Sequence, residues 1–228
     1  MGFYVIIILG DNMETEIRFY YSMECKDKIL KYLKEFKELK FNGRFYECTD
    51  QYNHPMEEFD FYNERIDGRF RVRKTTSDDY SKCMITWKRR LKDNKKELIH
   101  KEEEIEVSIN VEDYDNLCLL LNNVLHLKMV ESYERYRNLF NNDDVEVVVD
   151  EYPFGICIEI ESKSKTKNGE EIIKLWLDKL KFDINDAYRL SWDDKYEELC
   201  KNQSKKIEKI VRFNKDMPEV NNDFKVTR

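Results

Sequence analysis

The feature that most constrains this chain is a repeated alternation of charged and apolar residues along short segments. Residues 13–19 read METEIRF, in which Glu14, Glu16 and Arg18 take every second position and mostly apolar residues take the others. Successive side chains of a β-strand point to opposite faces of the sheet. We therefore expect a strand here with one charged face and one apolar face.

The same alternation recurs in five further segments, and the charges are sorted by segment. The bases are Arg69, Arg71, Arg73, Lys88, Arg90, Arg135 and Arg137, and the acids are Glu102, Glu104, Glu106, Glu159 and Glu161. An open antiparallel sheet with one face in water is the ordinary explanation for any single strand of this kind. A solvated face usually mixes both signs along each strand, however, so the sorting favours an enclosed charged surface.

The rest of the pattern predicts a mixed chain with few breaks, since there are only six glycines and three prolines in 228 residues. Further strands are expected at 44–49, 58–63, 68–75, 83–91, 102–109, 132–140, 145–150 and 156–162. Helices are expected at 26–39, 112–127, 168–182 and 192–211. We predict a single domain over residues 1–212, with its core at 13–162, C-terminal helices at 168–212 and a flexible tail at 213–228.

The predicted fold class is α+β. A sheet of roughly eight strands tends to curl, and closing it removes the exposed edges. We expect an eight-stranded antiparallel β-barrel clad by helices on its apolar face. The charged face then lines the interior.

Composition excludes several classes of protein. The formal net charge is −7, which argues against a broad basic surface for nucleic acid. The six cysteines are scattered without a CxxC pair, so reduced thiols are expected rather than disulfides or a zinc site. The apolar run at 3–9 is too short to cross a bilayer and reads as a strand or a buried lead-in. We expect a cytoplasmic protein without a membrane partner, as a monomer or a homodimer.

Opposed acids and bases inside a barrel have a definite chemical use. Clustered carboxylates retain protons near neutral pH unless a cation lies between them. Mg²⁺ or Mn²⁺ suits carboxylate oxygens, and guanidinium groups bind phosphate oxygens in pairs. A polyphosphate with its metal satisfies both walls, so the interior is interpreted as a polyphosphate-binding site.

These residues resemble the CYTH domain, the triphosphate tunnel metalloenzyme superfamily. The resemblance spans residues 13–162 and consists of six elements in the family's order. The ExExK signature stands as Glu14, Glu16 and Arg18, the R-x-R strand as Arg71 and Arg73, the lysine strand as Lys88 with Arg90, the acidic strand as Glu104 and Glu106, the K-x-R element as Arg135 and Arg137, and the ending as Asp150, Gly155, Glu159 and Glu161. At positions 18 and 135 arginine replaces the usual lysine, which keeps the charge and changes its geometry.

The resemblance implies roles for these residues. Metal ligands would be Glu14, Glu16, Glu159 and Glu161. The triphosphate would be held by Arg18, Arg71, Arg73, Lys88, Arg90, Arg135 and Arg137. Catalytic roles, as second metal site or in orienting the attacking water, would fall to Glu104, Glu106 and Asp150.

The expected activity is metal-dependent hydrolysis of a small-molecule triphosphate, whether inorganic, nucleoside or thiamine triphosphate. A class IV-type adenylyl cyclase is the main alternative, although no segment of the sequence indicates an adenine pocket. Two more alternatives remain: an RNA 5′-triphosphatase, with the RNA end as its only nucleic-acid partner, and a polyphosphate- or nucleotide-binding module without turnover.

Overall fold

The structure is a computed structural model that describes residues 13–90 and 97–226. The predicted apolar lead-in at 3–9 and the last residue of the strand predicted at 83–91 lie outside these ranges. The strands are β1 (Met13–Tyr21), β2 (Lys40–Asn53), β3 (Gly68–Ser77), β4 (Tyr80–Arg90), β5 (His100–Ile109), β6 (Lys128–Asn141), β7 (Val145–Tyr152), β8 (Gly155–Ser162) and β9 (Ile210–Val211). The helices are η1 (Met23–Cys25), α1 (Lys26–Lys34), η2 (Glu57–Phe59), η4 (Val111–Asp113), α2 (Tyr114–Leu119), η5 (Leu120–Val124), α3 (Gly169–Lys179), η6 (Ile184–Asp186) and α4 (Trp192–Asn202).

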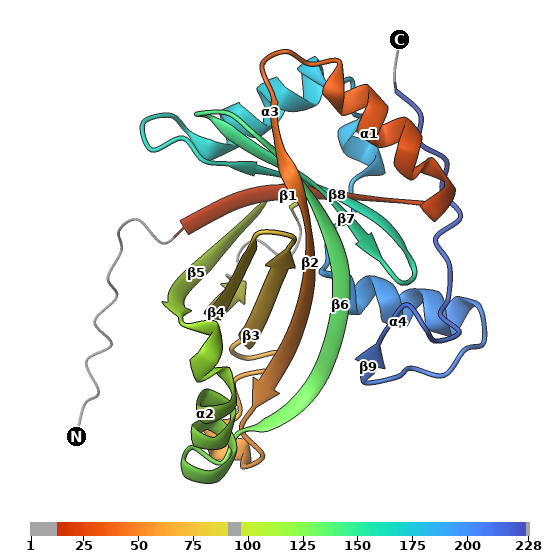
Figure 1. The fold of residues 1–228 in the computed structure, drawn as a ribbon. Helices are drawn as coiled ribbons and strands as arrows, with labels where there is room; N and C mark the ends of the chain where they lie inside the picture. Colours follow the sequence, from red (N-terminus) through yellow and green to blue (C-terminus); the bar gives the residue numbers. More distant parts are fainter. Residues whose placement is uncertain (1–12, 91–96, 227–228) are drawn as a thin grey trace.

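Eight strands close into an antiparallel barrel, which confirms the predicted fold class. Their order is β2-β3-β4-β5-β1-β8-β7-β6, and the pairing of β2 with β6 closes the sheet (Figure 1). The short strand β9 adds to β6 in parallel outside the barrel. Because β1 and β8 pair antiparallel with Arg18 opposite Glu159 and Glu16 opposite Glu161, the register places their charged residues on one face.

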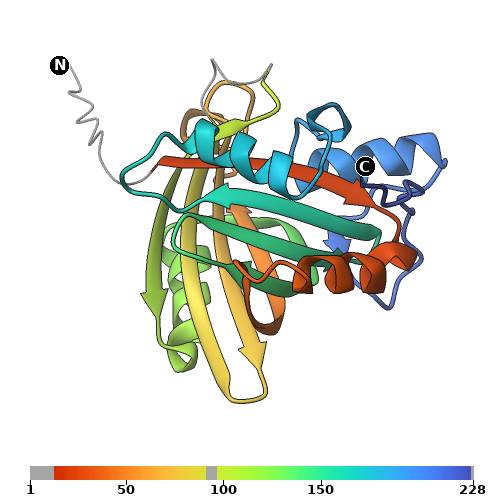
Figure 2. The ribbon, with the colours of Figure 1, turned by 90° about the horizontal axis from the view of Figure 1, so that it is seen from above.

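The apolar face of the β1-β8-β7 wall carries the main hydrophobic core. Ile17, Phe19 and Ile158 are fully buried there among residues from the helices. Helix α3 contributes Ile172 and Trp176 at helical spacing, and lies over β1 and β8 with α1 on the same side of the sheet (Figure 2). The charged face consequently points away from this core, into the barrel.

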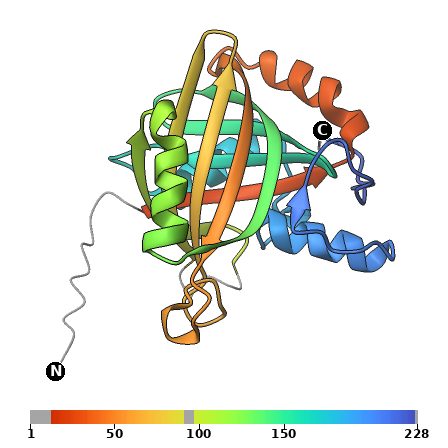
Figure 3. The same cartoon turned by 60° about the horizontal axis from the view of Figure 1, so that its bottom comes forward.

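Two smaller cores cover the remaining outer surface and one end of the barrel. Helix α2 and the residues after it place Leu121 and Leu127 against Val72 of β3 and Cys83 of β4 (Figure 3). At one end of the barrel, the rings of Tyr133, Tyr152 and Trp192 pack together in a separate cluster that α4 covers.

Two predicted elements are wrong. Residues 58–63 form no strand, because the Asn53 and Asp60 side chains accept backbone N–H bonds and hold a compact loop that includes η2. The helix predicted at 192–211 ends at Asn202, and Ser204 follows in the left-handed region with φ 54°. This backbone stops the helix, and the chain returns to form β9.

The predicted flexible tail is also wrong for the described residues up to 226. Met217, Val220 and Phe224 are buried, and Phe224 contacts the rings of Tyr21 and Tyr32. The backbone N–H of Val220 donates to the Phe154 carbonyl at 2.8 Å. Polar residues separate these buried apolar residues in the sequence, so the sequence pattern did not reveal that the segment packs. None of the helices in the described ranges has both the length and the apolar composition to span a membrane.

Candidate functional site

The barrel interior holds a cavity of about 510 Å³ whose walls are charged. Nine glutamates line it: Glu14, Glu16, Glu47, Glu102, Glu104, Glu106, Glu146, Glu159 and Glu161. Nine cationic residues line it as well: Arg18, Arg69, Arg71, Arg73, Lys82, Lys88, Arg135, Arg137 and Lys163. Because neither sign dominates, the cavity is suited to a ligand that brings both an anion and a cation.

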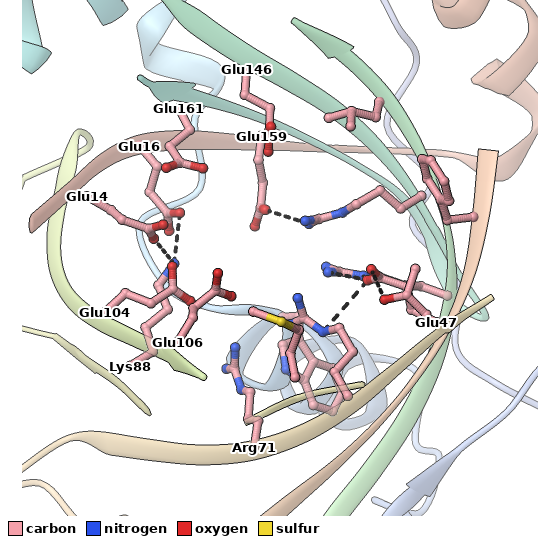
Figure 4. A pocket seen from close by; sticks show the side chains of 18 of the residues that line it. Glu14, Glu16, Glu47, Arg71, Lys88, Glu104, Glu106, Glu146, Glu159 and Glu161 are labelled. Atoms are coloured by element: carbon pink, nitrogen blue, oxygen red, sulfur yellow. Dashed lines mark hydrogen bonds and ion pairs between the residues drawn. The ribbon is translucent and has the colours of Figure 1, made fainter. Parts of the chain in front are cut away.

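The acidic side of the cavity is built by β1, β5 and β8, with Lys88 of β4 at its centre. The Lys88 ammonium lies 2.8 Å from Glu14, 3.1 Å from Glu16 and 3.2 Å from Glu102 (Figure 4). Burial raises the pKa of Glu14, but the Lys88 charge more than offsets this and holds that pKa well below its usual range.

The neutralisation by Lys88 does not extend to the whole acidic wall. Burial raises the pKa of Glu104 to about 8, and the neighbouring Glu14 adds to the rise. Burial and Glu14 likewise raise the pKa of Glu161 to about 8, although Lys163 lies 2.5 Å away and acts in the opposite direction. This wall therefore carries more carboxylates than its lysines can balance.

Two buried carboxylates bind the arginine side chains on the basic side of the cavity. Asp150 of β7 is fully buried and accepts hydrogen bonds from Arg135 at 2.7 Å and from Arg137 at 2.8 and 2.7 Å. Glu47 of β2 accepts from Arg135 at 2.8 Å and lies 3.7 Å from Arg73. These contacts fix the three guanidinium groups in place.

Arg71 differs from its neighbours because it forms no close ion pair with the residues that the structure describes. Its side chain points into the cavity from β3 (Figure 4), and its Nε donates to Gln51 at 3.4 Å. Among the described residues, no carboxylate lies within ion-pair distance of Arg71. A buried guanidinium without a close ion pair is able to accept an added anion.

Similarity to known proteins is detected in structure and not in sequence. No family model matches the sequence, and no curated protein matches it significantly. The PH1819 protein of Pyrococcus horikoshii superposes with a TM-score of 0.62 at 25% identity, covering 81% of this chain and 98% of that one.

Two further solved structures have the same barrel. HpAC1 of Hippeastrum, described as a candidate adenylyl cyclase with a dominant triphosphatase activity, has a TM-score of 0.56 at 17% identity over 85% of this chain and 97% of its own. A candidate adenylate cyclase of Vibrio parahaemolyticus has a TM-score of 0.54 at 13% identity over 78% of this chain and 95% of its own. The chain therefore shares the fold of these structures.

The closed barrel brings together most of the residues that the sequence singled out. Twelve of the fourteen line the cavity: Glu14, Glu16, Arg18, Arg71, Arg73, Lys88, Glu104, Glu106, Arg135, Arg137, Glu159 and Glu161. Arg90 does not line it, because it is buried at one end of the barrel beside Glu102 and Asp67. Asp150 also lies outside the lining and contacts it only through Arg135 and Arg137.

Arg18 lines the cavity but is already engaged. It is buried, forms an ion pair with Glu16, lies 3.5 Å from Glu159 and donates to the Leu190 carbonyl at 3.3 Å. Burial lowers its pKa, but the nearby carboxylates outweigh burial and raise it. In this barrel Arg18 therefore orients the acidic wall more than it offers free donors to an anion.

Several lining residues of the cavity had no expected role in the sequence. Glu47, Lys82, Glu146 and Lys163 were missed, whereas Arg69 and Glu102 were expected on the charged face but without a role. Glu146 is two residues from Val148 on the inward side of β7, and Lys163 follows β8 at the parity of Glu161. The sequence shows which face of its strand each of these residues lies on. Each is an isolated charge in its segment, however, and only the closed barrel shows which face of the strand points inward.

The carboxylates of the barrel fit a divalent cation in chemistry, although ion pairs occupy them here. Within residues 13–90 and 97–226, no three His, Cys, Asp or Glu side chains converge closely enough to hold a metal ion as they stand. Glu14 and Glu16 are turned towards Lys88, and Glu161 towards Lys163. The raised pKa values of Glu104 and Glu161 show the excess of carboxylates that a hard cation would relieve.

Proposed function

We propose that this protein is a metal-dependent hydrolase of triphosphate substrates. The observation that carries the proposal is the pair of opposed walls in one cavity, with surplus carboxylates on one side and an unpaired Arg71 on the other. Phosphoryl transfer needs positioning and charge neutralisation more than covalent help from the protein. A cavity with this charge separation supplies both.

The metal would be held by the acidic wall. Glu14, Glu16, Glu159 and Glu161 offer carboxylate oxygens from β1 and β8, which are adjacent strands. Mg²⁺ or Mn²⁺ bound there would supply an activated water and neutralise charge on the phosphates. Lys88 and Lys163, which now hold Glu14, Glu16 and Glu161, would then be released towards the substrate.

The phosphate chain would be bound by the basic wall. Arg71 has an unpaired charge, and Arg73 and Arg137 present guanidinium groups already fixed by Glu47 and Asp150. Fixed donors stabilise the charge that develops in the transition state without reorganising. Asp150 acts as a positioning residue in this scheme, because its carboxylate is covered by Arg135 and Arg137.

In this scheme Glu104 would take a proton from the attacking water. It lines the cavity on the acidic wall. Burial and the neighbouring Glu14 raise its pKa to about 8, so a cation bound beside it would have to lower that pKa before the carboxylate acts as a base. Glu106 is two residues further along β5, so its side chain lies on the same face of the strand, nearer its end. The description of HpAC1 as a protein with dominant triphosphatase activity supports the choice of hydrolysis over cyclisation for this fold.

A phosphate-release assay tests the proposal. Tripolyphosphate, ATP, thiamine triphosphate and triphosphate-ended RNA are each incubated with Mg²⁺, Mn²⁺ or EDTA. We expect metal-dependent release of phosphate from at least one substrate and no release in EDTA. Formation of cyclic AMP from ATP without phosphate release would identify a cyclase instead, and tight tripolyphosphate binding without any turnover would identify a binding module.

Two substitutions test the acidic wall and the basic wall separately. Glu159→Gln should lower metal-dependent turnover at least about 100-fold, because it removes a metal ligand while leaving a side chain of the same shape. Arg71→Ala should raise KM for the triphosphate about tenfold or more and leave the affinity for metal nearly unchanged. Arg65→Ala, in the exposed loop before β3, is the matched control and should change neither quantity. Normal activity in both cavity variants would contradict the proposed site.

A further inference from the structure

A carboxyl group that does not line the cavity is connected to Arg71 from behind. The Arg71 Nε donates to the Gln51 side-chain oxygen at 3.4 Å, and the Gln51 amide nitrogen donates to Glu131 Oε2 of β6 at 3.2 Å. Gln51 lies opposite Glu131 in the pairing of β2 with β6 and is fully buried. One buried amide therefore links the Arg71 guanidinium to the Glu131 carboxyl group.

The other oxygen of Glu131 meets a tyrosine that lies between two carboxyl groups. The Tyr62 hydroxyl oxygen is 3.3 Å from Glu131 Oε1 and 2.6 Å from Asp193 Oδ2 of α4. Burial raises the pKa of Asp193, but Arg69, which lies 3.5 Å from it, more than offsets this and holds that pKa well below its usual range. Asp193 is therefore ionised and accepts the Tyr62 proton.

The number of protons at Tyr62 then decides the state of Glu131. A tyrosine hydroxyl has one proton to donate, and here it goes to Asp193 at the shorter distance. Burial and the nearby Asp193 raise the pKa of Tyr62, so the hydroxyl keeps that proton. The contact between Tyr62 and Glu131 is consequently a hydrogen bond only when Glu131 carries a proton on Oε1 and donates it.

With that proton in place, the hydrogen bonds form a chain in which every donor points the same way. Arg71 donates to Gln51, Gln51 to Glu131, Glu131 to Tyr62 and Tyr62 to Asp193. Burial and the charge of Asp193 both raise the pKa of Glu131, to about 7. Loss of the proton would leave two acceptors facing each other at Tyr62 and place a negative charge behind Arg71.

The charges around Glu131 couple its ionisation to an anion in the cavity. The charged and titratable groups that face it are Asp193 of α4, Tyr62 of the loop before β3, and Arg69 and Arg71 of β3. Asp193 opposes the ionisation of Glu131, and the two arginines favour it. An anion bound to Arg71 offsets one of these favourable charges, so the anion favours the protonated form of Glu131. Because coupling between two binding events is reciprocal, protonated Glu131 must in turn favour the anion.

We propose that Glu131 is a positioning residue for the phosphate chain, whose protonated form leaves the Arg71 guanidinium available to the substrate and whose ionised form competes with the substrate for it. This inference rests on the proposed function and adds the regulation of the same site by pH. Glu131 acts through Gln51 and Arg71 and does not itself line the cavity. Its ionisation should therefore change substrate binding, measured as KM, and leave kcat nearly unchanged.

The test compares KM for tripolyphosphate with Mg²⁺ in the wild type and in Glu131→Gln at pH 6.0 and 8.5. A glutamine amide can donate to Tyr62 and accept from Gln51, so this variant copies the protonated form at every pH. The ratio of the wild-type KM to the variant KM should be near one at pH 6.0 and rise to about fivefold at pH 8.5. Dividing by the variant removes the ionisation of the substrate and of the acidic wall. Glu131→Asp keeps a titratable group and should restore part of the pH dependence.

Glu134→Gln is the matched control on the same strand. The Glu134 carboxylate accepts a hydrogen bond from the Tyr46 hydroxyl at 2.6 Å and does not line the cavity. The ratio of wild-type KM to Glu134→Gln KM should be equal at the two pH values. For Glu131→Gln, a KM ratio that does not change with pH, or a pH effect confined to kcat, would overturn the proposal, because a merely structural role would act at both pH values alike.

A second measurement separates this inference from the function on which it rests. Calorimetry of tripolyphosphate binding, repeated in two buffers of different ionisation enthalpy, gives the number of protons taken up and requires no turnover. At pH 7.5 the wild type should take up more protons than Glu131→Gln, and equal uptake would contradict the role of Glu131 even if triphosphate is hydrolysed. Binding without hydrolysis would refute the hydrolase alone, and a wild type that does not bind tripolyphosphate at any pH would refute both.

Discussion

Ion pairs in the cavity give different roles to residues that look equivalent in the sequence. Arg71 and Arg135 are both inward-facing arginines, but Arg135 is bound by Glu47 and Asp150 while Arg71 has no ion-pair partner among the described residues. A bound guanidinium is a fixed donor, and an unpaired one is a site for an added anion. Contacts, and not residue type, distinguish the two roles.

Glu104 supports a prediction about pH. Its pKa is about 8 in the folded protein and near 4.5 in an unfolded chain, so the folded state binds its proton more tightly. The stabilisation from that proton is complete below pH 4.5 and is lost as the pH rises through 8. Without metal, the free energy of unfolding should therefore fall between pH 6.5 and 8.5.

The measurement is urea unfolding in EDTA at pH 6.5, 7.5 and 8.5. The neutral variant Glu104→Gln should lose part of this decline, because its side chain cannot ionise. His100 acts in the opposite direction: burial lowers its pKa to about 4, so its contribution to stability still rises slightly above pH 6.5 as the unfolded chain loses its remaining protons. The comparison of the wild type with Glu104→Gln cancels this contribution. Parallel curves for the wild type and the variant would show that Glu104 is not responsible.

At the scale of elements, α4 serves both packing and the site. Ser191 is its N-cap residue, and the Ser191 backbone N–H donates to Asp194 at 3.0 Å. The Ser191 hydroxyl also accepts a hydrogen bond from Arg69 at 3.1 Å. The start of this helix therefore holds one of the cations that line the cavity.

Replacing the N-cap residues of two helices distinguishes the contribution of α4 to stability from its contribution to the cavity. Ser191→Ala and Asn168→Ala, the latter at the N-cap of α3, should each lower the free energy of unfolding by about 1 kcal/mol. Only Ser191→Ala should also raise KM for a triphosphate severalfold, because Arg69 loses a partner. The two variants are compared by urea unfolding and by phosphate release. An equal effect of both on KM would mean that α4 affects the cavity through stability alone.

At the scale of the whole molecule, the C-terminal segment ties the outer surface together. Phe224 lies between α1 and the aromatic rings around Phe182, and the Lys28 ammonium donates to the Phe224 carbonyl at 2.7 Å. Val220 packs in the cluster that α4 covers. One extended segment thus bridges two hydrophobic cores.

Phe224→Ala should therefore lower the free energy of unfolding by about 3–5 kcal/mol, as expected for a fully buried phenylalanine. Phe213→Ala, at a ring that is 39% exposed, is the control and should have a much smaller effect. A chain ending at Arg212 should be less stable still, because Met217 and Val220 are lost as well. Unfolding in urea measures all three, and full stability of the shortened chain would contradict the packing described here.

The sequence by itself determined the strand pattern apart from residues 58–63, the two-faced sheet, and twelve of the fourteen residues that were expected in the cavity. It could do so because alternation with period two is a local property of a strand. Only the tertiary structure decided the rest. It showed that Asp150 and Arg90 lie outside the cavity lining, that Glu47 and Glu146 face inward, and that the tail packs. Closure of the barrel brings together residues from strands far apart in the chain, and no local pattern records which partner each charge then meets.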